Sequence, residues 1–367
     1  MTGPDPIDTR FMALALTLGR RGLGNAWPNP AVGAVVAKDG VVVGRGWTQP
    51  GGRPHAEAQA LARAGEAARG ATIYATLEPC SHHGKTPPCV DAIVAAGIAR
   101  VVSALEDPNP KVAGQGHAQL RAAGIAVDVG LCAEEARRAH AGHIRRVRDG
   151  RPHVILKLAV SSDGKVGLAG RKPARITGEA ATARVHLMRA TSDAVLTGIG
   201  TVLSDDPQLT CRLPGMEHRS PVRVVLDSAL RLPPGSRLAT SAAQTLVWAF
   251  TGEAASAETE RPLDDLGVEV LRVPGADGRL DLGAALRALS ERGITRVMVE
   301  AGPIVSAAFL EADLVDEAAL FRSPDALGEG LDALDGMPLS ALTLSPKLRL
   351  VGTETVGRDT LQTFERK

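Results

Sequence analysis

The sequence predicts an α/β protein with two domains, and three observations support this prediction. Short apolar segments of strand type alternate with segments of helical period, which is typical of a sheet covered by helices. At 367 residues the chain is too long for one typical core, because domains usually hold roughly 100–200 residues. A charged helical segment at 134–151 separates two such alternating patterns. We therefore expect one domain at 1–146 and a second at 147–367.

The first domain is expected to begin with a helix at 8–21 and a hairpin at 32–44, in which a Lys-Asp-Gly turn joins two apolar runs. Helices and strands then alternate, and sheets of this kind place their sites at strand ends. The expected order is a helix from His55 to before Gly65, a strand at 71–79, a helix at 90–96, a strand at 99–105, a loop at 107–116, a helix ending near Gly124 and a strand at 125–130.

The second domain repeats this alternation after the segment 134–151, which we interpret as a solvated connecting helix. A surface loop or a short helix is expected at 253–265. The other expected elements are a strand that starts at 153, a helix at 179–189, strands at 193–198, 221–227, 245–250 and 268–273, a helix at 282–293, a strand at 296–302 and a helix at 306–314.

The composition argues against several classes of protein. Lysine and arginine number 42 against 41 aspartates and glutamates, so we expect no nucleic-acid partner. The N-terminus lacks the pattern of a signal peptide and no apolar run reaches about 18 residues, so we expect a cytoplasmic protein without a membrane partner. The 4 cysteines are few and unevenly spaced, which leaves metal binding or burial rather than a disulfide framework.

One constellation of residues indicates a metal site. His55 and Glu57 open a predicted helix, and Cys80 and Cys89 flank a proline-containing loop. A catalytic zinc ion takes three protein ligands and leaves one position for water. We therefore expect His55, Cys80 and Cys89 to bind Zn²⁺ and Glu57 to be the catalytic proton shuttle.

The order of these residues also indicates a reaction class. H-x-E followed by P-C and a second cysteine is typical of zinc-dependent nucleobase deaminases, although the usual two residues between the cysteines are here the longer stretch SHHGKTPP. Taken singly, each residue has an ordinary alternative as a helix cap, a solvated carboxylate or a buried thiol. The joint pattern favours zinc.

Four residues near this constellation are candidate substrate contacts. His82 and Lys85 lie between the cysteines and are expected, with His83, to face a polar or phosphorylated substrate. His82 and His83 are also rival metal ligands. Asn29 lies between two prolines and is placed to hydrogen-bond a pyrimidine edge, with an Asx-turn as the alternative.

Motifs along nearly the whole chain resemble one family. PNPAVGAVV, HAEAQAL, TLEPCSHHGKTPPC and EDPNPKVAGQG resemble the deaminase half of the bifunctional riboflavin-biosynthesis deaminase/reductase, and LKLAVSSDGKVG, LTGIGTVLSDDPQLTCR and VEAGPIVSAAFL resemble its reductase half. The resemblance implies a cytidine-deaminase-like three-layer α/β/α domain followed by a dihydrofolate-reductase-like α/β domain.

The resemblance also implies the reactions. The family hydrolytically deaminates a diamino-ribosylaminopyrimidinone 5'-phosphate and then reduces the ribosyl group to a ribityl chain with NADPH. The implied cofactors are Zn²⁺ and NADPH, the implied partner is a small phosphorylated pyrimidine substrate, and a homo-oligomer is expected on family grounds.

By resemblance, two sets of residues form the reductase site. Arg189 and Arg212 are expected on the substrate phosphate, where guanidinium groups bind bidentately, although Arg189 could equally be the solvated end of a helix. The residues expected at NADPH are Ala159, Thr201, Asp205, Ser228, Gly302, Pro303, Ile304, Val305, Ser306, Ala307 and Ala308. Those expected at the substrate are Lys157, Arg189, Leu209, Arg212 and Glu300.

The segment 299–309 supports a nucleotide site from its own chemistry. It reads as a strand, a Gly-Pro turn and a helix, whose N-terminal amides and dipole would favour a phosphate. The same sequence is also a routine connection from a strand to a helix. No general acid is assigned, because hydride transfer is the chemistry of the cofactor.

Three positions depart from the family pattern. Pro173 and Arg175 stand where relatives tend to carry a serine and an aromatic residue, and Asp325 stands where they often carry lysine. These departures leave open an altered or weakened reductase. Two other functions are alternatives: a zinc deaminase of another nucleoside, nucleotide or tRNA base with a nucleotide-binding second domain, and a ligand-responsive module with structural zinc, which Glu57 argues against.

Overall fold

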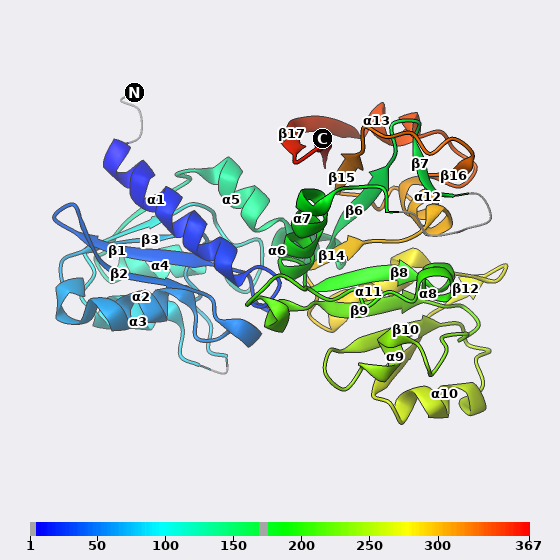
Figure 1. Ribbon diagram of the computed structural model, residues 1–367. Helices are drawn as coiled ribbons and strands as arrows, with labels where there is room; N and C mark the ends of the chain where they lie inside the picture. The colour runs from blue at the N-terminus through cyan, green and yellow to red at the C-terminus, as the bar shows by residue number, and fades with distance from the viewer. Residues whose placement is uncertain (1–4, 85, 169–174) are drawn as a thin grey trace. The chain divides into compact units, whose positions relative to one another are not determined.

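Each half of the chain is built on its own sheet (Figure 1). The computed structural model describes residues 5–84, 86–168 and 175–367 and divides the chain into the units Met1–Gly150 and Arg151–Lys367. The division falls at Gly150, whereas the sequence predicts a boundary after 146. Lys85 and Pro173 lie outside the described residues.

The first unit carries a sheet with the strand order β2-β1-β3-β4-β5 among its described residues. β1 pairs antiparallel with β2 and β3, whereas β3, β4 and β5 are parallel. Figure 1 shows α1 and α5 along one face of this sheet and α2 and α3 along the other. The strands are β1 Gly33–Lys38, β2 Val41–Trp47, β3 Thr72–Ala75, β4 Arg100–Ser103 and β5 Ala126–Val129, and the helices are α1 Pro6–Gly19, α2 Ala56–Ala64, α3 Cys89–Ala95, α4 Gln115–Ala122, α5 Ala133–Ala139 and α6 Ala141–Asp149.

The second unit carries a larger sheet, with the order β11-β10-β9-β8-β14-β6-β15-β18-β17 in the residues that the structure covers. The strands from β11 to β15 are parallel, and the C-terminal pair β18 and β17 is antiparallel. Its strands are β6 His153–Val160, β7 Lys165–Leu168, β8 Ala194–Gly198, β9 Val222–Leu226, β10 Val247–Thr251, β11 Val268–Arg272, β12 Gly275–Ala276, β13 Arg279–Leu280, β14 Arg296–Val299, β15 Glu317–Arg322, β16 Gly330–Asp332, β17 Leu348–Val356 and β18 Asp359–Arg366.

The helices of the second unit follow its parallel strands. The segment 253–265, expected as a loop or short helix, contains α10. The helices are α7 Glu179–Ala190, α8 Ile199–Asp205, α9 Arg237–Thr240, α10 Ala257–Asp264, α11 Leu282–Glu291, α12 Pro303–Glu311 and α13 Ser340–Thr343. None of the helices in the described ranges combines the length and the apolar character that a membrane-spanning segment requires.

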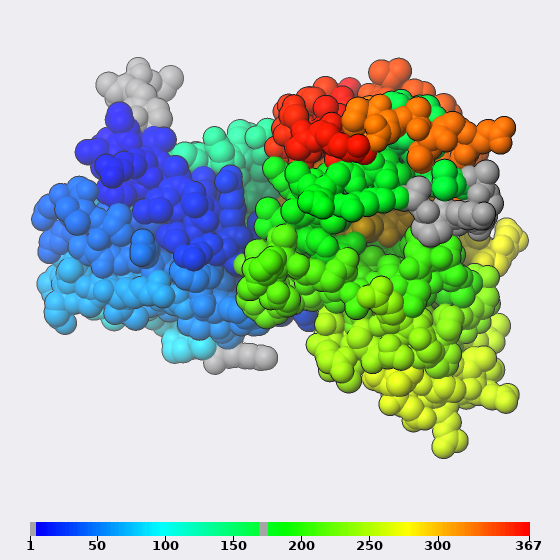
Figure 2. Space-filling view, viewed as in Figure 1, coloured from blue at the N-terminus to red at the C-terminus, as the bar shows by residue number. Residues whose placement is uncertain are grey.

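The outer strand β17 was not predicted from the sequence. Its residues alternate too weakly to stand out, because the strand is exposed from Arg349 to Thr355 and only Leu348 and Val356 at its ends are buried. Figure 2 shows this C-terminal segment, in red, at the surface of the second unit.

The prediction of a solvated connecting helix at 134–151 is wrong in two respects. The segment forms two helices, α5 and α6, that meet at His140. Its arginines are exposed or half-buried, but His140 is only 2% exposed and His143 only 9%. The sequence did not predict these two buried imidazoles, because the helical period of a highly charged segment does not distinguish a buried histidine from an exposed one.

Small residues let α2 lie directly on the hairpin. A Cβ atom added at Gly46 of β2 would lie 2.3 Å from the carbonyl oxygen of Ala56, and one at Gly44 would lie 2.1 Å from that of Ala60. The backbones of β2 and α2 therefore touch where these glycines stand. This contact fixes the first turn of α2, which carries Glu57 and follows His55.

Gly46→Ala tests this close contact. The added methyl group would meet backbone rather than a flexible side chain, so we expect the free energy of unfolding of the first unit to fall by about 1–3 kcal/mol. Gly40→Asn in the turn of the same hairpin is the control, because the position has a φ of 76°, nothing lies within 4 Å of its Cβ, and asparagine tolerates that conformation. Calorimetry would compare the two variants, and equal stability would contradict the contact.

Candidate functional site

Three potential metal ligands come together in the first unit. The ligand atoms of His55, Cys80 and Cys89 all lie within 4.8 Å of one another. Nδ1 of His55 lies 3.3 Å from Sγ of Cys89 and 3.6 Å from Sγ of Cys80. His55 is the N-cap of α2, Cys80 follows β3 and Cys89 is the first residue of α3, so three separate elements supply the donors.

The donor set fits a zinc ion with a free position. One imidazole nitrogen and two sulfurs are the ligands that catalytic zinc sites use, with the fourth tetrahedral position left for water. Within the part of the chain that the structure describes, no fourth histidine, cysteine or carboxylate joins this group. His82 and His83, the rival ligands, are exposed and lie outside it.

The three residues of this group shift one another's pKa values. A hydrogen bond from Cys89, together with His55, lowers the pKa of the Cys80 thiol to about 4. The same hydrogen bond raises the pKa of Cys89, and the contact with Cys80 raises the pKa of His55. One sulfur therefore reaches the thiolate form, the form that binds metals, well before the other.

Glu57 lies beside this group without belonging to it. It is the second residue of α2 and only 3% exposed. Burial raises the pKa of its carboxyl group. A buried carboxyl group with a raised pKa is suited to exchanging protons with a reactant.

Asn29 contacts the far side of the His55 ring. Its Nδ2 lies 3.0 Å from the carbonyl oxygen of Gly52, to which it donates, and 3.1 Å from Nε2 of His55. Gly52 has a φ of 83°, and a Cβ atom there would lie 2.8 Å from the Asn29 side chain. The side chain thus has partners outside its own turn, unlike the Asx-turn that the sequence left open, and it orients an imidazole whose other nitrogen faces the sulfurs.

The loop between the cysteines has one partner that the sequence did not indicate. Arg53 donates a hydrogen bond from Nη1 to Oγ1 of Thr86. It also approaches Gly84, where a Cβ atom would lie 3.3 Å from its Nη2. The only available signal was a cation two residues before His55, which is too common a feature to support a prediction.

A second group of potential metal ligands has a structural role, because one member accepts hydrogen bonds from the backbone. The group consists of Glu78, Glu106 and His117. Their ligand atoms lie within 4.8 Å of one another, but Glu78 already accepts three backbone hydrogen bonds. The donors are the N–H groups of Asp107, Gly114 and His117, at 2.9–3.1 Å. The carboxylate of Glu78 therefore ties the chain before Cys80 to the loop after β4.

In the second unit, a half-buried carboxylate is paired with two cations. Oε2 and Oε1 of Glu300 accept hydrogen bonds from Nε and Nη2 of Arg189, at 3.0 and 2.9 Å, and Nζ of Lys157 lies 3.6 Å from Oε1. Burial raises the pKa of Glu300, but Lys157 and Arg189 outweigh it and hold the pKa at about 2. The group carries two positive charges against one negative charge.

The structure assigns Arg189 a different partner from the expected one. All three of its guanidinium nitrogens donate to protein, since Nη1 reaches the carbonyl oxygen of Thr210 at 3.0 Å. It is 8% exposed and therefore is not a solvated helix end. In the structure its bidentate partner is Glu300, which becomes adjacent when α7 packs beside β14.

The turn after β8 and the turn after β14, both expected to contact the cofactor, are in contact with each other. Oγ1 of Thr201 in α8 accepts a hydrogen bond of 3.2 Å from the backbone N–H of Gly302, which caps α12. A Cβ atom at Gly198 would lie 2.7 Å from Val305. Since β8 and β14 are parallel partners, both turns leave the same edge of the sheet.

The other residues expected at the cofactor differ in exposure. Ile304 is 47% exposed, whereas Ser306 and Ala307 are buried, and Ser306 Oγ donates to the carbonyl oxygen of Ala301. Only the exposed face and the N-terminal amides of α12 are free to meet a ligand. Ala159, Thr201, Ser228, Gly302, Pro303, Val305 and Ala308 are half-buried, and Asp205 is exposed at the end of α8.

Two residues expected at the substrate lie in the loop after α8. Leu209 is buried and has a φ of 54°, a conformation that is rare for a bulky residue and concentrates at functional sites. Arg212 is exposed, and its side chain has one weak hydrogen bond, of 3.5 Å, to Gln208. Of the two arginines expected at the phosphate, Arg212 is the one that can turn to a ligand.

The described positions that depart from the family pattern have local partners. Nη2 of Arg175 lies 3.7 Å from Oε1 of Glu179, and the carboxylate of Asp325 lies 2.6 Å from Nη2 of Arg358. Asp325 therefore receives its cation from β17–β18, the C-terminal hairpin, instead of supplying a cation itself.

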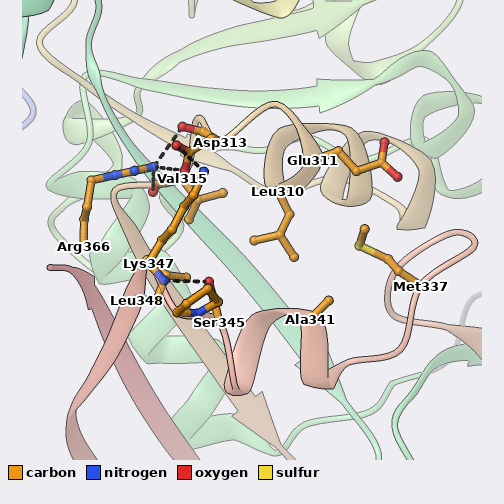
Figure 3. A pocket seen from close by; sticks show the side chains of 11 residues that line it. Leu310, Glu311, Asp313, Val315, Met337, Ala341, Ser345, Lys347, Leu348 and Arg366 are labelled. Carbon is orange, nitrogen blue, oxygen red and sulfur yellow. Dashed lines mark hydrogen bonds and ion pairs between the residues drawn. The ribbon is translucent and has the colours of Figure 1, made fainter.

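A pocket of about 220 Å³ lies at the far end of α12 from these turns (Figure 3). Leu310 and Met337 contribute to its apolar wall, and Asp313 forms ion pairs with Lys347 and Arg366, at 2.7 and 2.9 Å. The residues that line it include none of those expected at the substrate or at NADPH.

Comparison with protein families matches each unit separately. The family described as the cytidine and deoxycytidylate deaminase zinc-binding region matches residues 6–105. The RibD C-terminal domain family matches residues 152–362. The first match contains all three potential metal ligands, and the second contains every residue expected at the reductase site.

Relatives similar over their whole length carry both units. The chain is 42% identical to the riboflavin biosynthesis protein RibD of Escherichia coli over 364 residues, which cover 96% of this chain and 97% of the relative. It is 41% identical to RibD of Aquifex aeolicus, with 98% and 99% covered.

The fold is similar to solved structures of the same kind. RibD of Acinetobacter baumannii superposes with a TM-score of 0.87 at 37% identity, covering 98% of this chain and 99% of that one. A diaminohydroxyphosphoribosylaminopyrimidine deaminase/5-amino-6-(5-phosphoribosylamino)uracil reductase of Thermotoga maritima superposes with a TM-score of 0.85 at 38% identity, with the same coverage. The expected pairing of a deaminase-like fold with a dihydrofolate-reductase-like fold is confirmed.

Glu300→Gln tests the buried ion pairs. Removing the anion leaves Lys157 and Arg189 unpaired, so we expect the second unit to lose about 3 kcal/mol of unfolding free energy near neutral pH. The folded-state pKa of Glu300 lies below its ordinary value, so its stabilisation is fully present above pH 4.5 and is lost as the pH falls toward about 2.

Urea unfolding of both proteins at several pH values measures this difference. It should shrink as the pH falls below 4.5, and a difference that stays constant would contradict the assignment. Glu354→Gln is the control, because its pair with Arg184 is exposed and should contribute less than about 1 kcal/mol.

Proposed function

Because the chain belongs to the RibD family of riboflavin-biosynthesis proteins, we propose that its first unit is the deaminase and its second unit the reductase of one bifunctional enzyme. The family membership makes the chain an enzyme of riboflavin biosynthesis with zinc-dependent deaminase and NADPH-dependent reductase activities. The alternative, a deaminase of another nucleoside, nucleotide or tRNA base, is not favoured, because the match extends over both units at about 40% identity.

The observation that carries the assignment of the first unit is the convergence of His55, Cys80 and Cys89 beside the buried Glu57. In the proposal, the imidazole and the two sulfurs hold the zinc ion. Zinc supplies a reactive water at neutral pH, because coordination lowers the pKa of that water to about 7. Asn29 keeps the His55 ring oriented for this task.

Glu57 moves the protons in this proposal. Its carboxylate accepts a proton from the attacking water and passes it to the amino group that leaves the pyrimidine ring as ammonia. Its seclusion from bulk water keeps the proton between the reactants, because only 3% of the residue is exposed. The substrate is a diamino-ribosylaminopyrimidinone 5'-phosphate, and His82 and Lys85 are proposed to contact it.

The second unit is proposed to bind the deaminated product and NADPH at the carboxyl ends of β6, β8 and β14. NADPH supplies the hydride for the sugar carbon. We propose that the cofactor binds at Thr201, at Gly302 and at the N-terminus of α12, together with the other residues expected there. The parallel strands bring these groups to one edge of the sheet.

The substrate end of this site is proposed to lie at Lys157, Glu300, Leu209 and Arg212. Lys157 and Arg189 leave one positive charge in excess beside Glu300, and this excess favours an anionic ligand. We propose that Arg189 positions Glu300, while Arg212, whose side chain is exposed, binds the phosphate. A homo-oligomer, a cytoplasmic location and the absence of nucleic-acid and membrane partners complete the proposal.

Glu57→Gln separates metal binding from proton transfer. Glutamine has a similar shape but cannot exchange the proton, so we expect ammonia release to fall by a factor of about 10²–10⁴ while zinc remains bound. Metal analysis and an ammonia assay on the same preparation measure both. The reductase reaction, assayed with the deaminated intermediate and NADPH, is the internal control and should be unchanged; undiminished ammonia release would remove Glu57 from the mechanism.

Arg212→Ala tests the proposed phosphate contact. A charge-assisted hydrogen bond is worth about 1.5–3 kcal/mol, so KM for the phosphorylated intermediate should rise at least about tenfold. The effect should vanish with the dephosphorylated intermediate. Arg184→Ala, which removes an exposed arginine of α7, is the matched control. Equal effects on the two forms of the intermediate would place the phosphate elsewhere.

A further inference from the structure

Two buried imidazoles in the segment that ends the first unit have no part in the proposed chemistry. His140 lies between α5 and α6, and His143 lies in the first turn of α6. Both are almost completely buried, whereas the surrounding arginines are exposed or half-buried. A buried polar group is stable only when it is hydrogen-bonded, so the partners of these rings indicate what the segment does.

The partner of His143 is a carboxylate at the start of a loop. Nε2 of His143 lies 2.9 Å from Oδ1 of Asp107, which is only 7% exposed. A carboxylate oxygen accepts, so this nitrogen carries the hydrogen and donates it. The same oxygen accepts a hydrogen bond of 2.8 Å from the backbone N–H of Asn109. His143 thus holds the residue that shapes the loop 107–114.

This loop is fastened to the chain that carries a metal ligand. Glu78, two residues before Cys80, accepts hydrogen bonds from the N–H groups of Asp107 and Gly114, at 3.1 and 2.9 Å. These two residues are the ends of the loop. Immediately beyond it, a Cβ atom at Gly116 would lie 2.2 Å from the carbonyl oxygen of Pro79. Both ends of the loop, and the residue pair after it, are therefore held against the chain that leads to Cys80.

His140 makes a second attachment beside the first. Its Nε2 lies 3.0 Å from Oγ1 of Thr76, the residue after β3. That hydroxyl oxygen also accepts a hydrogen bond of 3.1 Å from the backbone N–H of Gly33. Burial lowers the pKa of His140 to about 4, so the ring is neutral at physiological pH. The α5–α6 segment is therefore bonded to the chain after β3 and to the chain after β4.

We propose that His143 is a positioning residue of the deaminase reaction, which acts through Asp107 to hold the loop 107–114 in the conformation that binds the pyrimidine substrate. The inference rests on the proposed function of the first unit. It assigns a role in deamination to the segment that leads into the reductase unit. The reductase reaction itself does not depend on this hydrogen bond.

Three variants of the full-length protein test the proposal. His143→Phe keeps a buried ring but removes the donor. His143→Gln keeps an N–H group near the position of Nε2. Arg148→Ala changes an exposed residue of the same helix and is the matched control. Each preparation is assayed for zinc content, for ammonia release over a range of substrate concentrations, and for NADPH oxidation with the deaminated intermediate.

We expect His143→Phe to raise KM for deamination about tenfold, which corresponds to about 1.4 kcal/mol, with kcat within a factor of about two. Zinc content and NADPH oxidation should equal those of the wild type. His143→Gln should restore most of the loss. Hydrogen exchange should quicken in the loop 107–114 of His143→Phe and stay unchanged in β3.

Several outcomes would overturn the proposal. An unchanged KM in His143→Phe would show that the hydrogen bond to Asp107 does not position the loop. Loss of zinc or of NADPH oxidation together with deamination, or failure of glutamine to rescue, would show a purely structural role. If the wild type itself binds zinc but releases no ammonia, the proposed deaminase function fails first, and that result is distinct from the others.

Discussion

The parallel pairing of β3 with β4 is the constraint on which the chemistry of the first unit depends. It brings the ends of both strands to one edge of the sheet, so that the chain carrying Cys80 and the loop that starts at Asp107 become neighbours. The contact of α2 with the hairpin then delivers His55 and Glu57 to the same place. Three elements must be correctly placed before any metal ligand has a partner.

In the second unit the central feature is a cluster of charged side chains whose charges do not cancel. Glu300 offsets one of the two cations that surround it, and the remaining positive charge favours an anion. Arg189 donates hydrogen bonds to Glu300 and to Thr210, and we propose that it positions Glu300. In the same proposal the phosphate is bound by Arg212, on the more exposed loop after α8.

Local patterns were sufficient for the fold class and for naming the three potential metal ligands that the structure brings together, because both depend on short motifs and on periodicity. The partner of Arg189 could not be predicted, since Glu300 lies far along the chain and meets it only through the order of strands in the sheet. His140 and His143 were missed for a related reason: a helical segment dense in arginine looks solvated, and nothing in its period marks the few positions that face a core. The strand β17 lacked the alternation that identifies strands, because it is exposed along most of its length.

The hydrogen bonds from α5 and α6 to the chain after β3 and β4 determine how long a fragment must be to keep the first unit intact. The zinc-binding family match ends at 105, and a fragment cut there would retain every metal ligand. It would nevertheless lack the loop 107–114 and leave Thr76 without the hydrogen-bond partner that His140 provides. A fragment intended to work as a deaminase therefore has to extend to Gly150. The helices α5 and α6 belong to the first unit and do not merely connect it to the second.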